Sequence, residues 1–304
     1  MVVAEGPQGP CTSVLEGRVL LHEEVKPARG VSMFGALDGP TLRPGSVSLR
    51  CRPDRTEQGT MVRGAVLVFL WLAGAEMLRE EQVERSGFCS WKCMKFVQMW
   101  PGSFCVALGP RFDCVIPESA DSWTIHGLWP SNVMNCCSCW HLFPSDLMDL
   151  PKELAQHWPT FLNASSFQFW KEEWRKHGTC AGCMEALSSP SKYFGAALGL
   201  RTMYNVDGAF QRTGILPSCN HSYQLHTLQE ALVPVLGKEH ELQCVTDGQA
   251  RQVLVQLKIS LFSNFSAGCL EEGARDFSPY RPCENQRRVF YFPPNQKTPR
   301  DPCP

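Results

Sequence analysis

Alternating apolar and polar residues predict four strands along the chain. Shorter patterns predict strands at Lys95–Trp100, Ser122–His126 and Val289–Phe292, and a Pro-Pro pair ends the last of them. In the second of these strands, His126 lies on the face opposite to Trp123. The clearest strand has an apolar residue at every second position: Val253, Val255, Leu257, Ile259 and Leu261.

Helical spacing of apolar residues predicts four helices, which intermix with the strands without a regular strand–helix–strand repeat. This mixture predicts an α+β fold, an antiparallel sheet with packed helices. We assign residues 88–295 to one domain and residues 296–304 to a tail. The helical segments are Ser145–His157, Ser166–His177, Tyr193–Tyr204 and Gln224–Leu236. Ser165 and Gln168 fit a capping box before the second helix, and Gly178 is a natural C-terminal stop after it.

The N-terminal part of the chain has a different character. Residues 1–60 are rich in Gly and Pro without a sustained period, so we expect disorder or a misassigned extension. At residues 61–75, Met-Val-Arg precedes an apolar run and Ala-Gly-Ala, which are the parts of a secretory signal peptide. The run is shorter than the roughly 20 residues that span a bilayer, so we expect no stable membrane insertion. The alternatives are a buried core segment or an uncleaved anchor. With a signal peptide here, translation would begin at Met61.

Sixteen cysteines are more than a cytosolic protein usually has, and they indicate a disulfide-stabilised fold in an oxidising compartment. Together with the signal-like segment, they predict a secreted or lysosomal protein. In such a protein, three Asn-x-Ser triplets are candidate glycosylation sites: Asn163, Asn220 and Asn264.

The formal net charge of −1 excludes a protein that attracts nucleic acid through a global basic field. A hydrophobic content of 43% excludes a disordered chain. An anionic ligand would therefore have to be captured at a local site.

The predicted helix after Ser165 offers one such site. At 100° per residue, Glu173, Lys176 and His177 fall on one side of it, next to Phe169. A carboxylate, an ammonium group and an imidazole beside an aromatic ring suit a phosphate ester and its base. The alternative interpretation is a solvated charged face held together by an i,i+4 pair.

His126 is the second candidate, in a strand between Trp123 and Trp129 with Gly127 beside it. A lone histidine in a strand is more often structural. Two histidines in aromatic-rich, glycine-terminated segments instead suggest a concerted acid–base pair, because an unperturbed pKa near 6.5 lets one ring be neutral while the other is charged. Lys176 would then offset the negative charge that develops in the transition state.

The segments SWTIHGLWP at 122–130 and FWKEEWRKHGTC at 169–180 resemble the two active-site segments of the ribonuclease T2 family, in particular its animal secreted and lysosomal members. The resemblance runs from about Trp91 to Pro294 and includes VQMWP at 97–101 and VFYFPP at 289–294. It implies an α+β fold. It also implies cleavage of single-stranded RNA by transesterification to a 2′,3′-cyclic phosphate, without a metal ion or another cofactor.

The resemblance also implies catalytic roles. His177 is expected to act as the base and His126 as the acid, while Glu173 and Lys176 stabilise the transition state.

The same resemblance implies residues that bind the bases. Trp129 resembles the aromatic residue that stacks on the base 5′ to the cut, and Phe169 and Gln98 resemble parts of a second base site. Because stacking accepts any base, low base specificity is implied.

Two positions depart from the family pattern. Glu172 stands where the family usually has a histidine that helps to bind the phosphate, so it places a negative charge near an anionic substrate. It also precedes Lys176 by four residues and can hold that lysine in an ion pair. Ser131 stands where an aspartate often contacts the base, so the resemblance does not indicate which base is preferred.

Three cysteine pairs resemble family disulfides: Cys105–Cys114, Cys136–Cys180 and Cys244–Cys283. Cys269 matches half of a fourth, but Ser260 lies near the place expected for its partner. The remaining cysteines favour further disulfides over a zinc site, which the spacing at 136–139 and 180–183 would otherwise suggest.

The sequence thus predicts a monomeric endoribonuclease that acts on RNA and passes through the secretory pathway. The alternative is a secreted ribonuclease-like protein with little or no catalysis that binds or signals. Glu172 favours the alternative, whereas the complete set of His126, Glu173, Lys176 and His177 favours the enzyme.

Overall fold

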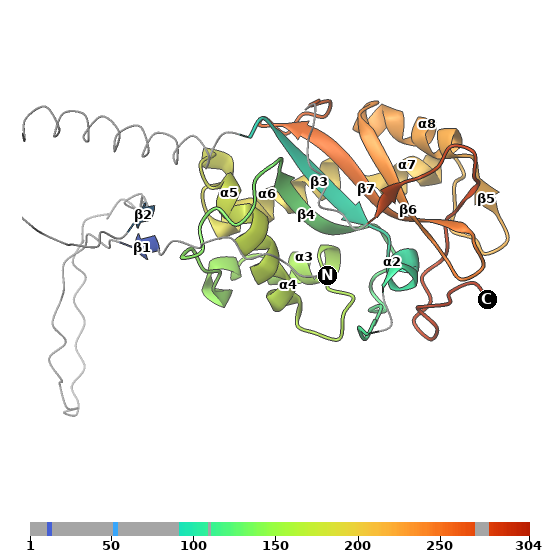
Figure 1. Cartoon of the computed structure of the whole chain (residues 1–304), viewed down its shortest axis with the longest axis horizontal. Coiled ribbons are helices and arrows are strands. Elements are labelled where there is room, and N and C mark those ends of the chain that lie inside the picture. The colour runs from blue at the N-terminus through green and yellow to red at the C-terminus, as the bar shows by residue number, and fades with distance from the viewer. Residues whose placement is uncertain (1–10, 14–50, 54–90, 109–110, 271–279) are drawn as a thin grey trace, which may run out of the picture. The chain divides into compact units, whose positions relative to one another are not determined.

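The computed structural model describes residues 11–13, 51–53, 91–108, 111–270 and 280–304 (Figure 1). The chain divides into two units, residues 1–60 and 61–304. In the first unit, where we expected disorder, strands β1 (Cys11–Ser13) and β2 (Cys51–Pro53) pair antiparallel. The segment expected to be a signal peptide, residues 61–75, lies outside the described residues.

The second unit is built on a seven-stranded sheet with the order β4-β3-β7-β6-β8, in which neighbouring strands are antiparallel. β9 joins β7 in parallel, and β5 pairs with β9. The four predicted strands are present as β3, β4, β7 and β9, and the structure adds β5, β6 and β8 to the sheet. The bounds are β3 (Cys93–Met99), β4 (Thr124–Pro130), β5 (Ser222–Tyr223), β6 (His240–Thr246), β7 (Gln252–Phe262), β8 (Arg281–Pro282) and β9 (Val289–Phe290).

Helices pack against this sheet, which confirms the α+β class. α6 contacts β3 and β4, and α8 contacts β6 (Figure 1). The α-helices are α2 (Pro101–Ala107), α3 (Pro151–His157), α4 (Ser166–Glu173), α5 (Thr179–Ala181), α6 (Pro190–Met203), α7 (Val206–Arg212) and α8 (Leu225–Leu236). Two 3₁₀-helices, η1 (Pro144–Leu147) and η3 (Glu185–Leu187), and a π-helical turn, η2 (Trp174–Gly178), complete the described elements.

The single helix predicted over residues 145–157 is wrong. The structure has η1 and then α3, and residues 148–150 separate them. Pro151 explains the break, because it has no N–H to donate to the preceding turn and its ring would clash with that turn. Leu150 has φ −116° and ψ 0°, and Pro151 instead occupies the first position of α3.

Strand β7 lies at the centre of the sheet and is buried on both faces. All residues from Gln252 to Ile259 are buried, including the polar Gln256 and Lys258. Buried polar side chains need hydrogen-bond partners, so these two residues belong to a polar network rather than to a solvent-exposed face.

The expected disulfides Cys105–Cys114, Cys136–Cys180 and Cys244–Cys283 are confirmed. The partner of Cys269, which the sequence left open, is Cys93, and Cys219 pairs with Cys303. Cys183 is also disulfide-bonded. Because Cys136 and Cys180 bond to each other, their thiols are not available as zinc ligands. Crosslinks of this kind each stabilise a fold by about 2–4 kcal/mol.

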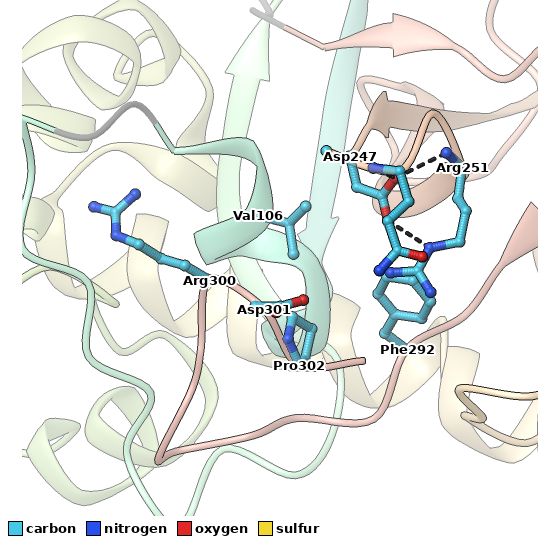
Figure 2. A pocket seen from close by; sticks show the side chains of 9 residues that line it. Val106, Asp247, Arg251, Phe292, Arg300, Asp301 and Pro302 are labelled. Atoms are coloured by element: carbon cyan, nitrogen blue, oxygen red, sulfur yellow. Dashed lines mark hydrogen bonds and ion pairs between the residues drawn. The ribbon is translucent and has the colours of Figure 1, made fainter. Parts of the chain in front are cut away.

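The segment 296–304 returns to the domain and ends with Cys303 buried. Figure 2 shows where it passes the turn between β6 and β7. There Arg251 pairs with Asp247 at 2.6 Å, lies over the ring of Phe292 and donates a hydrogen bond to the carbonyl of Cys303. A cavity of about 330 Å³ at this place is lined by residues outside the two histidine segments, among them Val106, Arg300, Asp301 and Pro302.

None of the helices in the described ranges is both long enough and apolar enough to cross a bilayer.

Candidate active site

His126 lies at an irregularity of the sheet. The register of β3 and β4 shifts beside Val97, which pairs with Gly127, so His126 is the extra residue of a β-bulge. The indole N–H of Trp158 donates a 3.0 Å hydrogen bond to the carbonyl of His126, which satisfies a backbone group that the bulge removes from the ladder. The bulge therefore re-aims the His126 side chain without an orphaned carbonyl.

The predicted helix over residues 166–177 changes its winding before it reaches His177. Ser165 caps α4 by accepting a 3.2 Å bond from the backbone N–H of Phe167, so the expected capping box with Gln168 is not what holds this end. After Glu173 the chain forms the π-helical turn η2. Such turns are rare and occur frequently at functional sites. Beyond Glu173, the 100° spacing therefore no longer describes which side chains share a face.

Gly178 is not the helix stop that the sequence suggested. It has helical backbone angles, φ −60° and ψ −40°, and the chain stays helical through α5. A Cβ at Gly178 would collide with the indole ring of Trp174, which is fully buried. The glycine therefore allows close packing of this turn over Trp174.

Trp129 is the centre of the cluster that these elements form. Its indole N–H donates a 2.8 Å hydrogen bond to Oε2 of Glu173. Its ring stacks on that of His177 at an interplanar angle of 29°, with centroids 5.1 Å apart, and lies edge-on to His126, with centroids 4.9 Å apart. Phe169 completes the group, 6.0 Å from His126 between ring centroids. The structure thus brings together five of the residues that the sequence singled out.

Gly127 makes this arrangement possible. A Cβ at this position would collide with Nε1 of Trp129 and with Oε2 of Glu173, the two atoms of the central hydrogen bond. A glycine is required here because the backbone of β4 passes directly against that bond.

Burial lowers the pKa of both histidines, that of His126 to about 4 and that of His177 to about 3. The hydrogen bond from His126 to Gln256 raises its pKa, whereas the charges of Lys258 and Lys176 lower it. The neighbouring His126 contributes to lowering the pKa of His177. Both rings are therefore neutral at pH 7, and an anionic phosphate between them would raise both pKa values.

Glu173 is only 5% exposed, and burial raises its pKa to about 7. The hydrogen bond from Trp129 and the charge of Lys176 act in the opposite direction. The carboxyl group can therefore exist in either protonation state near neutral pH.

Lys176 lies at the rim of the cluster, with its side chain 42% exposed. Its Nζ is 3.8 Å from Oε2 of Glu172, so the expected ion pair is present. The same oxygen lies closer to Arg175, at 2.8 Å, and this hydrogen bond is the main cause that lowers the pKa of Glu172. The charge of Glu172 is thus shared between two cations rather than held against Lys176 alone.

Gln98, the residue expected in the second base site, lies in the core and not with the other candidate site residues. It is fully buried, and its amide nitrogen donates a 2.9 Å hydrogen bond to the carbonyl of Tyr204. It therefore has no exposed surface for contact with a base in this conformation.

The sequence did not reveal Gln256, whose Oε1 lies 2.6 Å from Nδ1 of His126. Gln256 stands among the polar residues that alternate with the apolar ones in β7, a pattern that reads as an ordinary strand. A polar side chain in the most central strand was the available signal, because such a residue must find a partner inside the protein.

Comparison with known proteins gives one consistent result. The family model of the ribonuclease T2 family matches residues 91–280. The chain is 38% identical to mouse ribonuclease T2-A over 178 residues, which are 58% of this chain and 66% of the mouse protein. It is 31% identical to human ribonuclease T2 over 259 residues, which are 79% of this chain and 96% of the human protein.

Comparison with solved structures leads to the same family. A crystal structure of human RNase T2 superposes with a TM-score of 0.57 at 33% identity and covers 67% of this chain and all of that chain. RNase NT, crystallised in complex with 5′-AMP, superposes with a TM-score of 0.56 at 25% identity and covers 67% of this chain and 98% of that chain.

Proposed function

Because the chain belongs to the ribonuclease T2 family, we propose that it is an endoribonuclease that cleaves single-stranded RNA by transesterification to a 2′,3′-cyclic phosphate. The observation that supports this best is the position of His126, on a strand, and His177, on a helical turn, against the same indole ring of Trp129, which His177 stacks on and His126 meets edge-on. Two imidazoles in one cluster can serve both ends of a displacement at phosphorus.

The proposed reaction begins when neutral His177 removes the proton from the 2′-hydroxyl. The 2′-oxygen then bonds to phosphorus, the bond from phosphorus to the 5′-oxygen breaks, and His126 gives its proton to the departing oxygen. The pKa of about 3 for His177 and about 4 for His126 supports this division, because His177 is the first of the two to lose its proton as pH rises. A bound phosphate anion would raise the protonated fraction of His126.

Lys176 and Glu173 would stabilise the transition state. Lys176 is exposed enough to approach a phosphate oxygen and would offset its developing charge. Glu173 would hold the cluster in place through Trp129, and its raised pKa of about 7 lets the protonated form donate a hydrogen bond to a phosphate oxygen.

Base binding would use Trp129 and Phe169, two aromatic side chains of the cluster that are partly exposed. Stacking contributes about 1–3 kcal/mol per base and accepts any base, which supports low base specificity. Gln98 would act in the second base site only by supporting the residues around it, since it is buried.

We also propose that the protein enters the secretory pathway and is secreted or lysosomal. The disulfides of the domain suit an oxidising compartment. The three sequon asparagines, Asn163, Asn220 and Asn264, are all exposed, as glycan attachment requires.

A second function, a secreted binding or signalling protein with weak catalysis, is favoured by Glu172. Its carboxylate occupies both Arg175 and Lys176 near the place where a phosphate would bind. Such a protein would bind RNA or another ligand through the same aromatic cluster and turn over slowly.

An in-gel RNA cleavage assay at pH 5 and pH 7 separates the two functions. Purified protein is compared with a His126→Ala variant that is prepared in the same way. Cleavage by the unchanged protein alone supports the enzyme. Equal residual cleavage by both proteins at both pH values rejects it and favours the binding protein.

A further inference from the structure

A line of hydrogen bonds leads from His126 across three strands to Glu241. Nδ1 of His126 lies 2.6 Å from Oε1 of Gln256. Nε2 of Gln256 donates a 2.8 Å bond to Oε1 of Gln243, and Nε2 of Gln243 donates a 2.6 Å bond to Oε1 of Glu241. The register of β6 and β7 supports this line, because it sets Gln243 directly opposite Gln256.

The two amides at the middle of this line are fully buried. A buried amide that turns over would exchange its donor and acceptor ends and leave its neighbours with mismatched partners, at a cost of roughly 1–3 kcal/mol for each unsatisfied group. The orientation of each amide is therefore tied to that of the next one. A group that fixes the donor and acceptor ends of the amide at one end of the line therefore also fixes those of the amide at the other end.

The direction is set at Glu241. An ionised carboxylate can only accept hydrogen bonds, so Gln243 must turn its NH₂ group toward Glu241. Its oxygen then faces Gln256 and requires the NH₂ group of that residue. The oxygen of Gln256 is left for His126, and it can only accept.

We propose that Glu241 is a positioning residue for His126, which acts through Gln243 and Gln256 to keep a hydrogen on Nδ1 and leave Nε2 to exchange the catalytic proton. The catalytic half of this statement rests on the proposed ribonuclease function, whereas the placement of the hydrogen does not. The arrangement suits both protonation states of His126, because the Nδ1–H bond to Gln256 persists when Nε2 gains or loses its proton.

Other charges also face His126. Lys258 of β7 and Lys176 of η2 lower its pKa, and His177 lies in the same cluster. Lys258 also stands opposite Glu241 in the register of β6 and β7. Removal of the Glu241 charge can therefore change the pKa of His126 through Lys258 alone. For this reason the test measures which ring nitrogen holds the hydrogen, a property that a distant charge does not select.

The experiment compares Glu241→Gln with Glu239→Gln, an exposed glutamate two residues earlier. Histidine labelled with ¹⁵N is incorporated, and the His126 signals, assigned with a His126→Ala sample, are recorded at pH 7.5. We expect the Nδ1–H tautomer in the unchanged protein and in Glu239→Gln. In Glu241→Gln, whose amide can accept or donate, we expect the ratio of Nδ1–H to Nε2–H to fall roughly tenfold, the size of one net hydrogen bond. An unchanged ratio overturns the proposal.

A second variant, Gln256→Glu, guards against poor folding of the first. Its carboxylate retains an acceptor for Nδ1–H and adds a negative charge, so we expect the same tautomer and a higher pKa of His126. An unchanged pKa, or a shift to the Nε2–H tautomer, overturns the proposal.

Cleavage of a dinucleotide by the same samples tests the catalytic half. We expect kcat of Glu241→Gln to fall about tenfold with KM little changed, as when a histidine loses the group that orients it. If the unchanged protein cleaves no RNA, the proposed function fails, and the tautomer measurement still decides whether Glu241 positions His126. If the tautomer shifts while kcat stays constant, the catalytic half of the proposal is overturned.

Discussion

The indole N–H of Trp129 donates a 2.8 Å hydrogen bond to the carboxylate of Glu173, and this bond joins the two histidine segments. Trp129 belongs to the strand that holds His126, and Glu173 is the last residue of α4, directly before the π-helical turn that holds His177. The bond therefore ties the strand of His126 to the helical segment that leads to His177.

Replacement of Trp129 by Phe tests this link. The aromatic ring and its stacking on His177 remain, whereas the bond to Glu173 is lost. We expect kcat to fall about tenfold, the equivalent of one hydrogen bond of about 1.5 kcal/mol, while KM changes little. Trp91→Phe is the matched control, because it removes an indole bond to the carbonyl of Cys180, outside the cluster. Similar kinetics of the two variants would show that the Trp129 bond has no special role.

The raised pKa of Glu173 predicts a pH-dependent stability. The unfolded carboxyl ionises near pH 4.5, whereas the folded one keeps its proton up to about pH 7. The unfolded state therefore binds fewer protons in this range, and the contribution of Glu173 to the free energy of unfolding falls as pH rises from 4.5 to 7. The full change corresponds to up to about 3 kcal/mol.

Glu173→Gln cannot titrate, so we expect its stability relative to the unchanged protein to increase over this pH range. The lowered pKa values of His126 and His177 act in the opposite direction, since they add stability as pH rises toward 6.5. Taking the difference between the two proteins cancels that contribution. Urea unfolding at pH 4, 5, 6, 7 and 8 measures the difference in the free energy of unfolding between the two proteins. A difference that is constant with pH would show that Glu173 titrates normally.

Glu172 is expected to limit phosphate binding, because its charge lies 2.8 Å from Arg175 and 3.8 Å from Lys176. Glu172→Gln frees both cations, and we expect kcat/KM to rise up to about fivefold, the value of an exposed ion pair. Glu172→His adds a further donor, so its kcat/KM should exceed that of Glu172→Gln. Steady-state kinetics at low ionic strength would reveal the effect. Equal kcat/KM values for all three proteins would exclude Glu172 as the limiting residue.

Gly127→Ala tests the close approach of β4 to the central bond. The added methyl group must displace Trp129 or Glu173, so we expect a loss of about 1–3 kcal/mol in the free energy of unfolding and a large loss of RNA cleavage. Gly199→Ala, on the exposed face of α6 with no atom near the new methyl group, should instead gain about 0.5–1 kcal/mol. A Gly127→Ala protein as stable and active as the parent would refute the packing argument.

Local patterns predicted much of this domain. The alternation at 253–261 led to β7, and apolar spacing led to α6 and α8 within a few residues of their true bounds. These segments could be predicted because the spacing of their apolar residues reflects a single face that packs against the rest of the protein. The prediction of one helix over Ser145–His157 was wrong, because Pro151 interrupts the helix even though the spacing of apolar residues is helical over all thirteen positions.

The site could be predicted only in part, because some of its residues meet through contacts between segments that are distant in the sequence. The two motifs identified His126 and His177, but the π-helical turn begins at Trp174, whose indole N–H donates a hydrogen bond to the carbonyl of Trp140, 34 residues away, and no local pattern encodes that contact. Gln256 meets His126 across 130 residues of sequence, and no local pattern encodes that meeting. Likewise, the pairing of the Glu172 carboxylate with both Arg175 and Lys176 follows from side-chain geometry rather than from spacing along the helix.

The most direct test of the account is product analysis on a dinucleotide in the presence of EDTA. We expect a 2′,3′-cyclic phosphate as the first product, detected by ³¹P NMR, at a rate that EDTA leaves unchanged. We also expect a rate at least about a hundredfold lower for His126→Ala and for His177→Ala, because each variant lacks a general acid or base. A linear phosphate formed without the cyclic intermediate, or equal rates in the parent and both alanine variants, would contradict the account.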